Sequence, residues 1–561
     1  MQANYDVVIL GGGLAGLSLS IQLKRANPNL SILVLERREG AAATAAHKVG
    51  ESTVELGSYY LRNVLGMKDY LEEHELPKHG LRYFFPSKTK GDITSRLELG
   101  PRKLLKVKSH QLDRGTLENY MTKHTQSLGT RFIGGGIAKD VDFGEAMHTV
   151  RYKYQGEEQT VTGRWVVDAS SRVSILKRKL GFQQPMEHGA SAVWWRMKGV
   201  VDIDDWSEDT NWKNYLEPRL RYLSTVHFMD KGYWLWVIPL GSKNTSFGIV
   251  ADPAIHPLET YNTYEKALEW MKVNEPLVYG KLVSQPENLM DFMVLKHYAH
   301  HSGRFFSGKE RWAVTGEAGA FLDPFYSPGT DLISMSNSWI TDLIVRDKEG
   351  EEVDARARVF EQSYISLLDF WLPIYQNKYP LMGNTQIFSV KIFWDWAIYW
   401  AVTTKLFING GLTNMSVLKR LFATEGGVGA RFGALSNVMQ AHFIAWHPYD
   451  KAMFTERYVD VFDMPFMHKL QSEIEDKFGP KELLDKIEEN MGILESMAVS
   501  IFQYTASIVK GLPEDTPINP YKFNLEADPS TYTGEGAITP LPHVREQMST
   551  LWFYKQMAEL A

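Results

Sequence analysis

Three glycines near the start of the chain have a spacing that suits the binding of a pyrophosphate. Gly11, Gly13 and Gly16 follow an apolar stretch (5–10) that predicts a buried strand, and they precede an apolar run (17–23) that predicts a helix. This order gives a tight turn, exposed backbone and a helix N-terminus that faces the phosphates. An acid that follows the second predicted strand (30–35) suits a ribose. The sequence therefore predicts a dinucleotide site formed by Gly11, Gly13, Leu14, Ala15, Gly16 and Glu36.

Two tryptophans one residue apart form a second chemical feature. Trp234 and Trp236 lie in an apolar stretch (234–239) that predicts a strand. Because side chains alternate between the two faces of a strand, both indoles point the same way and make a rigid wall. Leu235 and Val237 then pack on the other face. An ordinary sheet core explains such a pair when it stands alone, but the other motifs of this chain favour a wall that borders a cavity.

The stretches 166–172 and 312–318 each read as a short apolar strand that runs into a turn of small residues with an acid. Here the chain resembles the FAD-containing superfamily that includes hydroxybenzoate hydroxylase, geranylgeranyl reductase and the flavin-dependent halogenases. The resemblance implies FAD as the cofactor. Ser171 stands where the superfamily has glycine, and Glu317 stands where it has aspartate. From these and two further similar motifs (47–52 and 111–117), the FAD contacts are expected to include Lys48, Ser52, Arg114, Asp168, Gly316 and Glu317.

Within that superfamily the chain resembles the flavin-dependent halogenases at three points. Residues 234–239 match their W-x-W-x-I-P motif, and residues 321–329 match their F-x-x-P-x-x-S-x-G motif. The third point is Lys78, which aligns with the segment that carries the family's catalytic lysine. The resemblance covers about the first 345 residues. It assigns substrate shielding to Trp234, Trp236 and Pro239, and a halide and flavin loop to Phe321, Pro324, Ser327, Gly329 and Thr330.

The resemblance also implies a reaction. In such enzymes reduced FAD reacts with oxygen to give a hydroperoxide, and chloride or bromide attacks it to give hypohalous acid. The paired indoles keep the organic substrate away from the flavin. The hypohalous acid then travels to the lysine, which holds it beside an electron-rich aromatic. An ammonium suits this role because it is a compact donor whose pKa falls readily on burial.

Two residues depart from the family pattern. Tyr326 stands where tryptophan halogenases have a glutamate, so the chain resembles the members that act on phenols or pyrroles. We expect a phenolic substrate rather than tryptophan. Pro328 has no N–H group, which predicts a weaker or differently selective halide site. An FAD-dependent aromatic monooxygenase or reductase without halide chemistry is therefore the main alternative. A third possibility is a flavin-binding scaffold that recognises a carrier protein.

The sequence contains one glycine-rich dinucleotide-binding motif, the one at Gly11, Gly13 and Gly16, and that motif is assigned to FAD. Gly134–Gly136 and the stretch 427–433 lack the strand or the spacing that a second site requires. We therefore expect reduced FAD to come from a separate flavin reductase. The sequence leaves open whether the aromatic substrate is a free small molecule or is attached to a carrier protein.

Composition excludes several classes of function. The net charge of −6 gives no electrostatic attraction for nucleic acid, and the absence of cysteine excludes disulfides, thiol catalysis and cysteine metal sites. No spacing of histidines and carboxylates predicts a metal site. The first strand begins without a charged and apolar leader, and uncharged runs are too short for a membrane span, so a cytoplasmic protein is expected.

The expected fold class is α/β, with a Rossmann-like FAD-binding domain of the hydroxybenzoate hydroxylase type. Residues 1–180 together with 300–345 would form that discontinuous domain. Residues 181–299 would form an inserted, mainly β substrate domain, and residues 346–561 a mainly helical C-terminal domain. In the last region the spacing of Phe388, Ile392, Phe393, Trp396 and Trp400 favours a core helix over a wall of the substrate pocket.

Overall fold

The computed structural model describes residues 4–44, 49–87, 89–283, 286–422, 427–450 and 458–550. An eight-stranded sheet forms its N-terminal part, in the order β18-β19-β10-β1-β2-β7, with β9 pairing β10 and β8 pairing β9. The strands β19, β10, β1, β2 and β7 are parallel. The members are β1 (Asn4–Leu10), β2 (Ile32–Glu36), β7 (Arg131–Gly134), β8 (Ile137–Asp142), β9 (His148–Tyr154), β10 (Glu157–Asp168), β18 (Phe306–Ser307) and β19 (Trp312–Val314).

The central strands of this first sheet, such as β1 and β2, are apolar runs of the sequence. Parallel strands are covered by helices on both faces, so their side chains must be apolar on both faces. The predicted first helix extends over α1 (Leu14–Ala26), which packs against α4 (Arg114–Ser127) and α9 (Gly329–Lys348). The prediction of an α/β FAD-binding fold is confirmed.

A second eight-stranded sheet carries the paired tryptophans. Trp234 and Trp236 belong to one buried cluster while Leu235 and Val237 belong to another, so the predicted alternation is confirmed. The sheet runs in the order β16-β12-β15-β14-β13-β4-β5-β20. Its strands are β16 (Leu289–Leu295), β12 (Ser191–Lys198), β15 (Asn244–Ala251), β14 (Tyr233–Pro239), β13 (Thr225–Asp230), β4 (Leu81–Phe84), β5 (Glu98–Leu99) and β20 (Tyr458–Val459).

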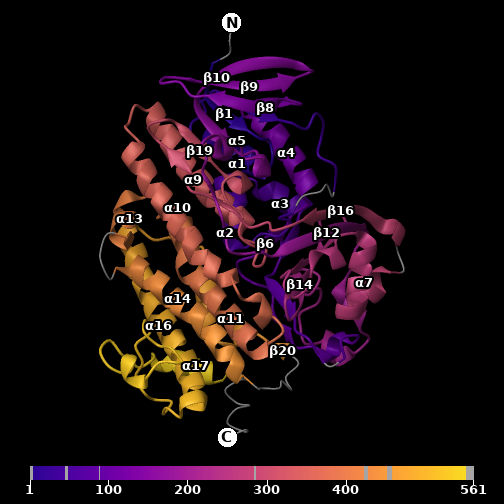
Figure 1. The fold of residues 1–561 in the computed structure, drawn as a ribbon, viewed down its shortest axis with the longest axis vertical. Coiled ribbons are helices and arrows are strands. Elements are labelled where there is room, and N and C mark those ends of the chain that lie inside the picture. The colour runs from indigo at the N-terminus through magenta and orange to yellow at the C-terminus, as the bar shows by residue number, and fades with distance from the viewer. Residues whose placement is uncertain are drawn as a thin grey trace.

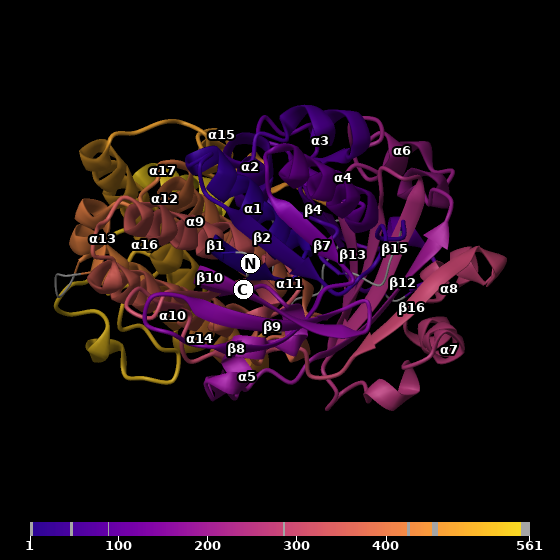
Figure 2. The ribbon, with the colours of Figure 1, turned by 90° about the horizontal axis from the view of Figure 1, so that it is seen from above.

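The C-terminal region is mainly helical. Its helices are α10 (Asp354–Tyr375), α11 (Thr385–Ile398), α12 (Thr404–Ile408), α13 (Met415–Phe422), α14 (Val428–Trp446), α15 (Pro465–Ser472), α16 (Pro480–Lys510) and α17 (Pro542–Ser549). Figures 1 and 2 show these helices on one side of the first sheet and the second sheet on the other. Helix α11 is buried from Gln386 to Ile398, as the prediction of a core helix requires.

The second sheet draws strands from all three expected segments. Strands β4 and β5 come from the 1–180 segment, and β20 comes from the C-terminal segment. Short elements link the layers: β3 (Leu76–Lys78) with β6 (Ser109–Gln111), β11 (Gln183–Gln184) with β17 (His301–Ser302), and helices α2 (Glu55–Tyr59), α3 (Lys68–His74), α5 (Ile175–Lys179), α6 (Thr210–Lys213), α7 (Tyr264–Asn274) and α8 (Pro276–Leu282).

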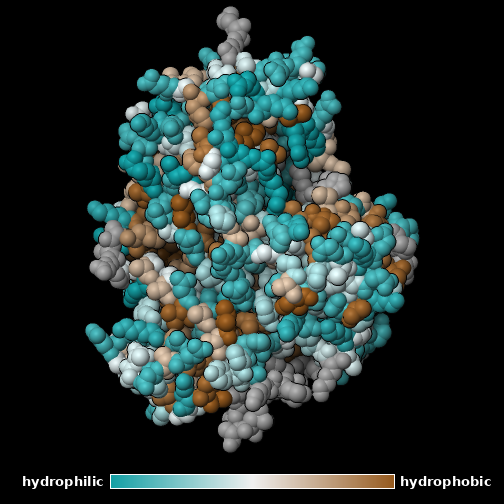
Figure 3. All heavy atoms as spheres, in the orientation of Figure 1, coloured by the Kyte–Doolittle hydropathy of each residue, from teal (hydrophilic) through white to brown (hydrophobic). Residues whose placement is uncertain are grey.

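In the part of the chain that the structure describes, one helix is long and apolar enough to cross a membrane by length and composition. This helix is α16, and 72% of its most apolar window is buried inside the protein. Figure 3 shows hydrophilic residues over most of the face that it presents, with hydrophobic residues in scattered groups.

A buried ion-pair network joins β4 and β5 to the segment before β13 in the second sheet. The Glu98 carboxylate accepts hydrogen bonds from Arg82 Nη1 at 2.6 Å and from Arg221 Nη2 at 2.9 Å. Glu98 and both arginine side chains are at most 1% exposed. Removing one member leaves a buried charge without its partner, which is more costly than losing an exposed pair.

Glu98→Gln should therefore destabilise the protein by about 3–5 kcal/mol, as measured by urea unfolding. Asp485→Asn, which breaks an exposed Lys481–Asp485 pair, should cost less than about 1 kcal/mol. Equal unfolding midpoints for the two variants would contradict the role given to Glu98.

Candidate functional site

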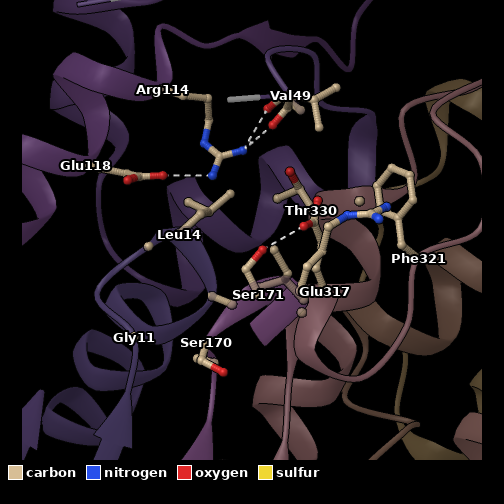
Figure 4. A pocket seen from close by; sticks show the side chains of 18 of the residues that line it. Gly11, Leu14, Val49, Arg114, Glu118, Ser170, Ser171, Glu317, Phe321 and Thr330 are labelled. Carbon is tan, nitrogen blue, oxygen red and sulfur yellow. Dashed lines mark hydrogen bonds and ion pairs between the residues drawn. The ribbon is translucent and has the colours of Figure 1, made fainter. Parts of the chain in front are cut away.

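A cavity of about 740 Å³ opens where the parallel strands of the first sheet end. Its lining comes from the turns after β1, β10 and β19, the last residue of β2, and the first residues of α4 and α9. Open α/β sheets bind their ligands at the carboxyl ends of the strands. Figure 4 shows how Gly11, Leu14, Arg114, Ser171 and Glu317 converge on this space from separate segments.

The glycine turn has the shape of a backbone cradle. Gly11 has a φ of +115°, and a Cβ atom there would lie 2.3 Å from the carbonyl oxygen of Ala169. A Cβ at Gly16 would lie 2.0 Å from the carbonyl oxygen of Gly11, so Gly16 supports helix packing and does not line the cavity. A Cβ at Gly13 would meet nothing within 4 Å. Gly13 therefore presents open backbone to the cavity, as bound phosphates require.

Polar side chains hold the segments around the cavity in place. Glu36 accepts a hydrogen bond from the N–H of Gly12 at 2.7 Å. Arg114 donates to the carbonyl oxygen of Val49 at 2.7 Å and to Glu118 at 2.8 Å, as Figure 4 shows. Ser171 donates to Glu317 at 2.7 Å and so joins the turns after β10 and β19.

Not every expected FAD contact reaches the cavity. The buried carboxylate of Asp168 accepts hydrogen bonds from the N–H groups of Ser170 and Leu176, so it shapes the turn after β10 instead of lining the cavity. Lys48 lies outside the described residues. The residues of the prediction that do line the cavity are Gly11, Gly13, Leu14, Ala15, Glu36, Ser52, Arg114, Gly316 and Glu317.

The paired indoles form part of the same cavity wall. The ring centroids of Trp234 and Trp236 lie 5.6 Å apart. Trp236 lies against Gly248 of the neighbouring strand, where a Cβ would come within 2.2 Å of the indole. The indole N–H of Trp234 donates to the Tyr379 hydroxyl at 3.1 Å. Pro239 ends β14 and does not line the cavity.

The predicted halide loop lies at the start of α9. Tyr326 and Ser327 have φ values of +68° and +59°, a left-handed conformation that costs non-glycine residues about 1–3 kcal/mol each. Pro328 then precedes the helix, and Gly329 and Thr330 are its first two residues. The first N–H groups of a helix have no partner within it and attract anions. Pro328 is the N-cap residue, so its missing N–H removes the first of these donors and leaves those of Gly329 and Thr330. Phe321, Pro324, Ser327, Gly329 and Thr330 all line the larger cavity.

A second, smaller cavity of about 70 Å³ contains Lys78. Aromatic side chains of the C-terminal helices form much of its wall, among them Trp396 and Trp400. Its ionisable and hydroxyl-bearing lining residues include Lys78, Glu55, Tyr326, Asp331, Tyr375, Asp395 and Tyr399. The helix that the sequence assigned to the core thus also forms a cavity wall.

Lys78 is fully buried. Its Nζ atom donates to Ser52 Oγ at 2.7 Å and to the Thr53 carbonyl oxygen at 2.6 Å. Burial lowers the pKa of Lys78 to about 7, although the charges of Glu55 and Asp331 act in the opposite direction. The ammonium and amine forms are therefore both accessible near neutral pH.

The two cavities approach each other at a cluster of three hydroxyl groups. Ser52 lines the larger cavity and accepts the hydrogen bond from Lys78, which lines the smaller one. Ser327 Oγ donates to Ser52 Oγ at 3.0 Å, and Thr225 shares a hydrogen bond with Ser52 at 2.8 Å. These hydroxyls separate the space beside the indoles from the space beside the lysine.

Sequence reasoning missed the acids around Lys78. Glu55 follows the loop that contains Ser52, but a single glutamate carries no recognisable motif. Asp395 lies in an apolar run of the sequence, and the structure pairs it with Lys391 in the buried helix. Among the described residues, no group of three or more His, Asp or Glu side chains is placed to hold a metal ion.

Comparisons with known proteins agree with this geometry. The FAD binding domain family matches residues 4–249. The chain is 28% identical over 441 residues to flavin-dependent halogenase chlA of Dictyostelium discoideum. The aligned region covers 72% of this chain and 71% of that relative. It is 23% identical to 1H-pyrrole-2-carbonyl-peptidyl-carrier-protein brominase of Pseudoalteromonas luteoviolacea, over 71% of this chain and 87% of that relative.

The fold is similar to that of a solved halogenase, PltM in complex with phloroglucinol and FAD. The TM-score is 0.59 at 15% sequence identity, and the match covers 88% of this chain and 96% of that chain. The likeness therefore extends well into the C-terminal helices, beyond the FAD binding domain.

Gly13→Ala should weaken FAD binding at least tenfold, which corresponds to about 1.4 kcal/mol, because the new methyl group enters the open side of the cradle. Titration of flavin fluorescence measures this affinity. The thermal midpoint of the FAD-free variant should match that of the wild type.

Gly11→Ala is the matched comparison, because its methyl group overlaps the protein backbone at a positive φ. It should lower the thermal midpoint as well as the affinity for FAD. Wild-type affinity in Gly13→Ala would rule out this turn as the pyrophosphate site.

Proposed function

The chain belongs to the flavin-dependent halogenase family, and we propose that it transfers oxidised halogen to a phenolic substrate held beside Lys78. One observation carries this proposal. Lys78 is a buried amine that lines a small aromatic cavity and is hydrogen bonded to Ser52, a residue of the larger cavity. A hydroxylase that delivers oxygen directly needs substrate and flavin in one space, whereas this chain separates the two cavities.

The residues present fit FAD. The open backbone at Gly13 and the N-terminus of α1 would hold the pyrophosphate. Glu36, at the end of β2, lies on the side where the ribose is expected. When bound and reduced, FAD would supply, with oxygen and halide, the hypohalous acid that the reaction consumes.

Residues of the two cavities would control where the hypohalous acid forms and where it reacts. The N-terminus of α9 would hold the halide through the N–H groups of Gly329 and Thr330. Trp234 and Trp236 would block an aromatic substrate from the larger cavity. The Lys78 ammonium would donate a hydrogen bond to the hypohalous acid and orient its halogen towards the substrate ring.

The small cavity favours a hydroxylated benzene as the substrate. Trp396 and Trp400 offer faces for stacking, and the Glu55 carboxylate offers an acceptor for a hydroxyl group. PltM, whose structure contains phloroglucinol, shares the fold. A monooxygenase without halide chemistry is the second candidate, since Pro328 alters the halide loop.

Lys78→Ala should lower halogenation of a phenol by about 10²–10⁴-fold, because the group that holds the hypohalous acid is lost. FAD binding and the release of hydrogen peroxide should persist. Mass spectrometry of the product, with a flavin reductase and bromide present, measures the loss through the bromine isotope doublet.

Lys405→Ala is the matched control, since Lys405 is another buried lysine, donates to the Glu473 carbonyl oxygen, and lines neither cavity. It should brominate like the wild type. A Lys78→Ala enzyme with full activity would exclude the role of Lys78, and a wild-type product that gains only oxygen would favour the monooxygenase.

A separate reductase should be needed to reduce FAD. Anaerobic NADPH should leave the absorbance of the bound flavin unchanged over minutes, and a catalytic amount of flavin reductase should bleach it. Rapid bleaching by NADPH alone would show that the chain reduces its own flavin.

A further inference from the structure

Three carboxylates line the cavity of Lys78, and each comes from a different helix. They belong to Glu55 at the start of α2, Asp331 in the first turn of α9, and Asp395 in α11. The proposed reaction must remove protons from a phenol, so a carboxylate with a free share of its hydrogen-bonding capacity has a chemical use there.

Two of the three carboxylates already accept hydrogen bonds at both oxygens. Asp331 accepts from the N–H of Gly57 at 2.8 Å and from the Tyr399 hydroxyl at 2.7 Å. Asp395 accepts from Gln440 at 2.7 Å and from the Tyr326 hydroxyl at 2.8 Å, and it is also paired with Lys391. Both carboxylates are therefore already engaged by protein groups, although burial also raises the pKa of Asp331 to about 7.

Glu55 is less firmly engaged. The indole N–H of Trp400 donates to its Oε1 atom over a long 3.2 Å. Burial raises the pKa of Glu55, while hydrogen bonding from its own backbone N–H, the nearby charge of Lys78 and hydrogen bonding from Gln471 and Trp400 oppose that rise. A buried carboxylate with weak partners has more affinity for a proton than one that is fully hydrogen bonded.

We infer that Glu55 is the general base that takes the hydroxyl proton of the phenol while Lys78 presents the hypohalous acid. This inference rests on the proposed function. Tyr326 stands where tryptophan halogenases have a glutamate, and in this chain the carboxylate beside the lysine comes from α2 instead.

The proton and electron movements balance. Glu55 takes the phenol proton, and the resulting phenolate forms a carbon–halogen bond as the halogen–oxygen bond breaks. The departing hydroxide takes a proton from the Lys78 ammonium and leaves as water. The ring then loses its C–H proton to the Lys78 amine, and Glu55 returns its proton to the phenolate oxygen. The sum is phenol plus hypohalous acid giving halophenol plus water.

Several other ionisable groups face this cavity and shape its pH dependence. They are Lys78 on β3, Asp331 on α9, Tyr375 at the end of α10, Tyr399 after α11, Tyr326 in the predicted halide loop, and Asp395 of α11, which is paired with Lys391. A change of buffer pH would therefore titrate several groups at once. The role of Glu55 is better tested at one pH with phenols of different acidity.

The test compares Glu55→Gln with the wild type on two phenols at pH 7: phenol itself, and a polyfluorinated phenol that is ionised at that pH. Glutamine keeps an oxygen for Trp400 and removes the base. Activity on phenol should fall by about 10²–10⁴-fold, the usual contribution of a general base. Activity on the ionised phenol should fall by less than about tenfold, because its proton is already gone.

Glu75→Gln is the matched control. Glu75 is also buried, accepts from the N–H of Asp113 at 2.8 Å and lines neither cavity. Burial raises its pKa to about 8. This variant should keep the wild-type ratio of the two activities. Trapping of free hypobromous acid with taurine should give the same yield in the wild type and in Glu55→Gln.

Equal losses on both phenols, or no loss on either, would overturn the assignment of Glu55. A wild-type enzyme that halogenates neither phenol, with reductase and bromide supplied, would instead defeat the proposed function itself. The two failures are therefore distinguishable.

Discussion

The whole arrangement depends on one buried ammonium. Taking an ammonium out of water costs several kcal/mol, and here the cost is met in part by two hydrogen bonds and by the nearby charges of Glu55 and Asp331. The remaining penalty is seen in the lowered pKa of Lys78. The same burial suits the amine to the proposed reaction, since a group that gains and loses a proton near neutral pH can both donate a hydrogen bond to hypohalous acid and accept a proton.

The C-terminal helices complete the site, although the dinucleotide motif lies elsewhere. They supply the aromatic wall around Lys78, and they also brace the indole wall. Trp234 donates to Tyr379, and Tyr379 donates to the buried carboxylate of Asp323 at 2.8 Å. Tyr298 and His188 contact the same carboxylate. Because Asp323 belongs to the predicted halide loop (321–329), one polar network fixes this loop and the indole wall relative to each other.

The sequence predicted those parts of the site that are formed by residues close together in the chain. The glycine turn, the strands on either side of it and the shared face of Trp234 and Trp236 follow from spacing alone, and the resemblance pointed to Lys78. The roles of Glu55 and Asp395 depend on contacts between segments hundreds of residues apart, which no short pattern encodes. Asp168 shows a different limit of sequence patterns. It was expected to contact FAD, but its carboxylate accepts hydrogen bonds within its own turn.

The proposed reaction is divided in space: the oxidant is made in one cavity and used in the other. A crystal structure of the protein with FAD and a bound phenol that resists halogenation measures this most directly. We expect FAD in the larger cavity and the phenol ring between Lys78 and Trp396. The indoles and the Ser52 hydroxyl cluster should lie between the flavin and the phenol. A phenol that lies against the flavin ring, on the same side of the indoles, would contradict it.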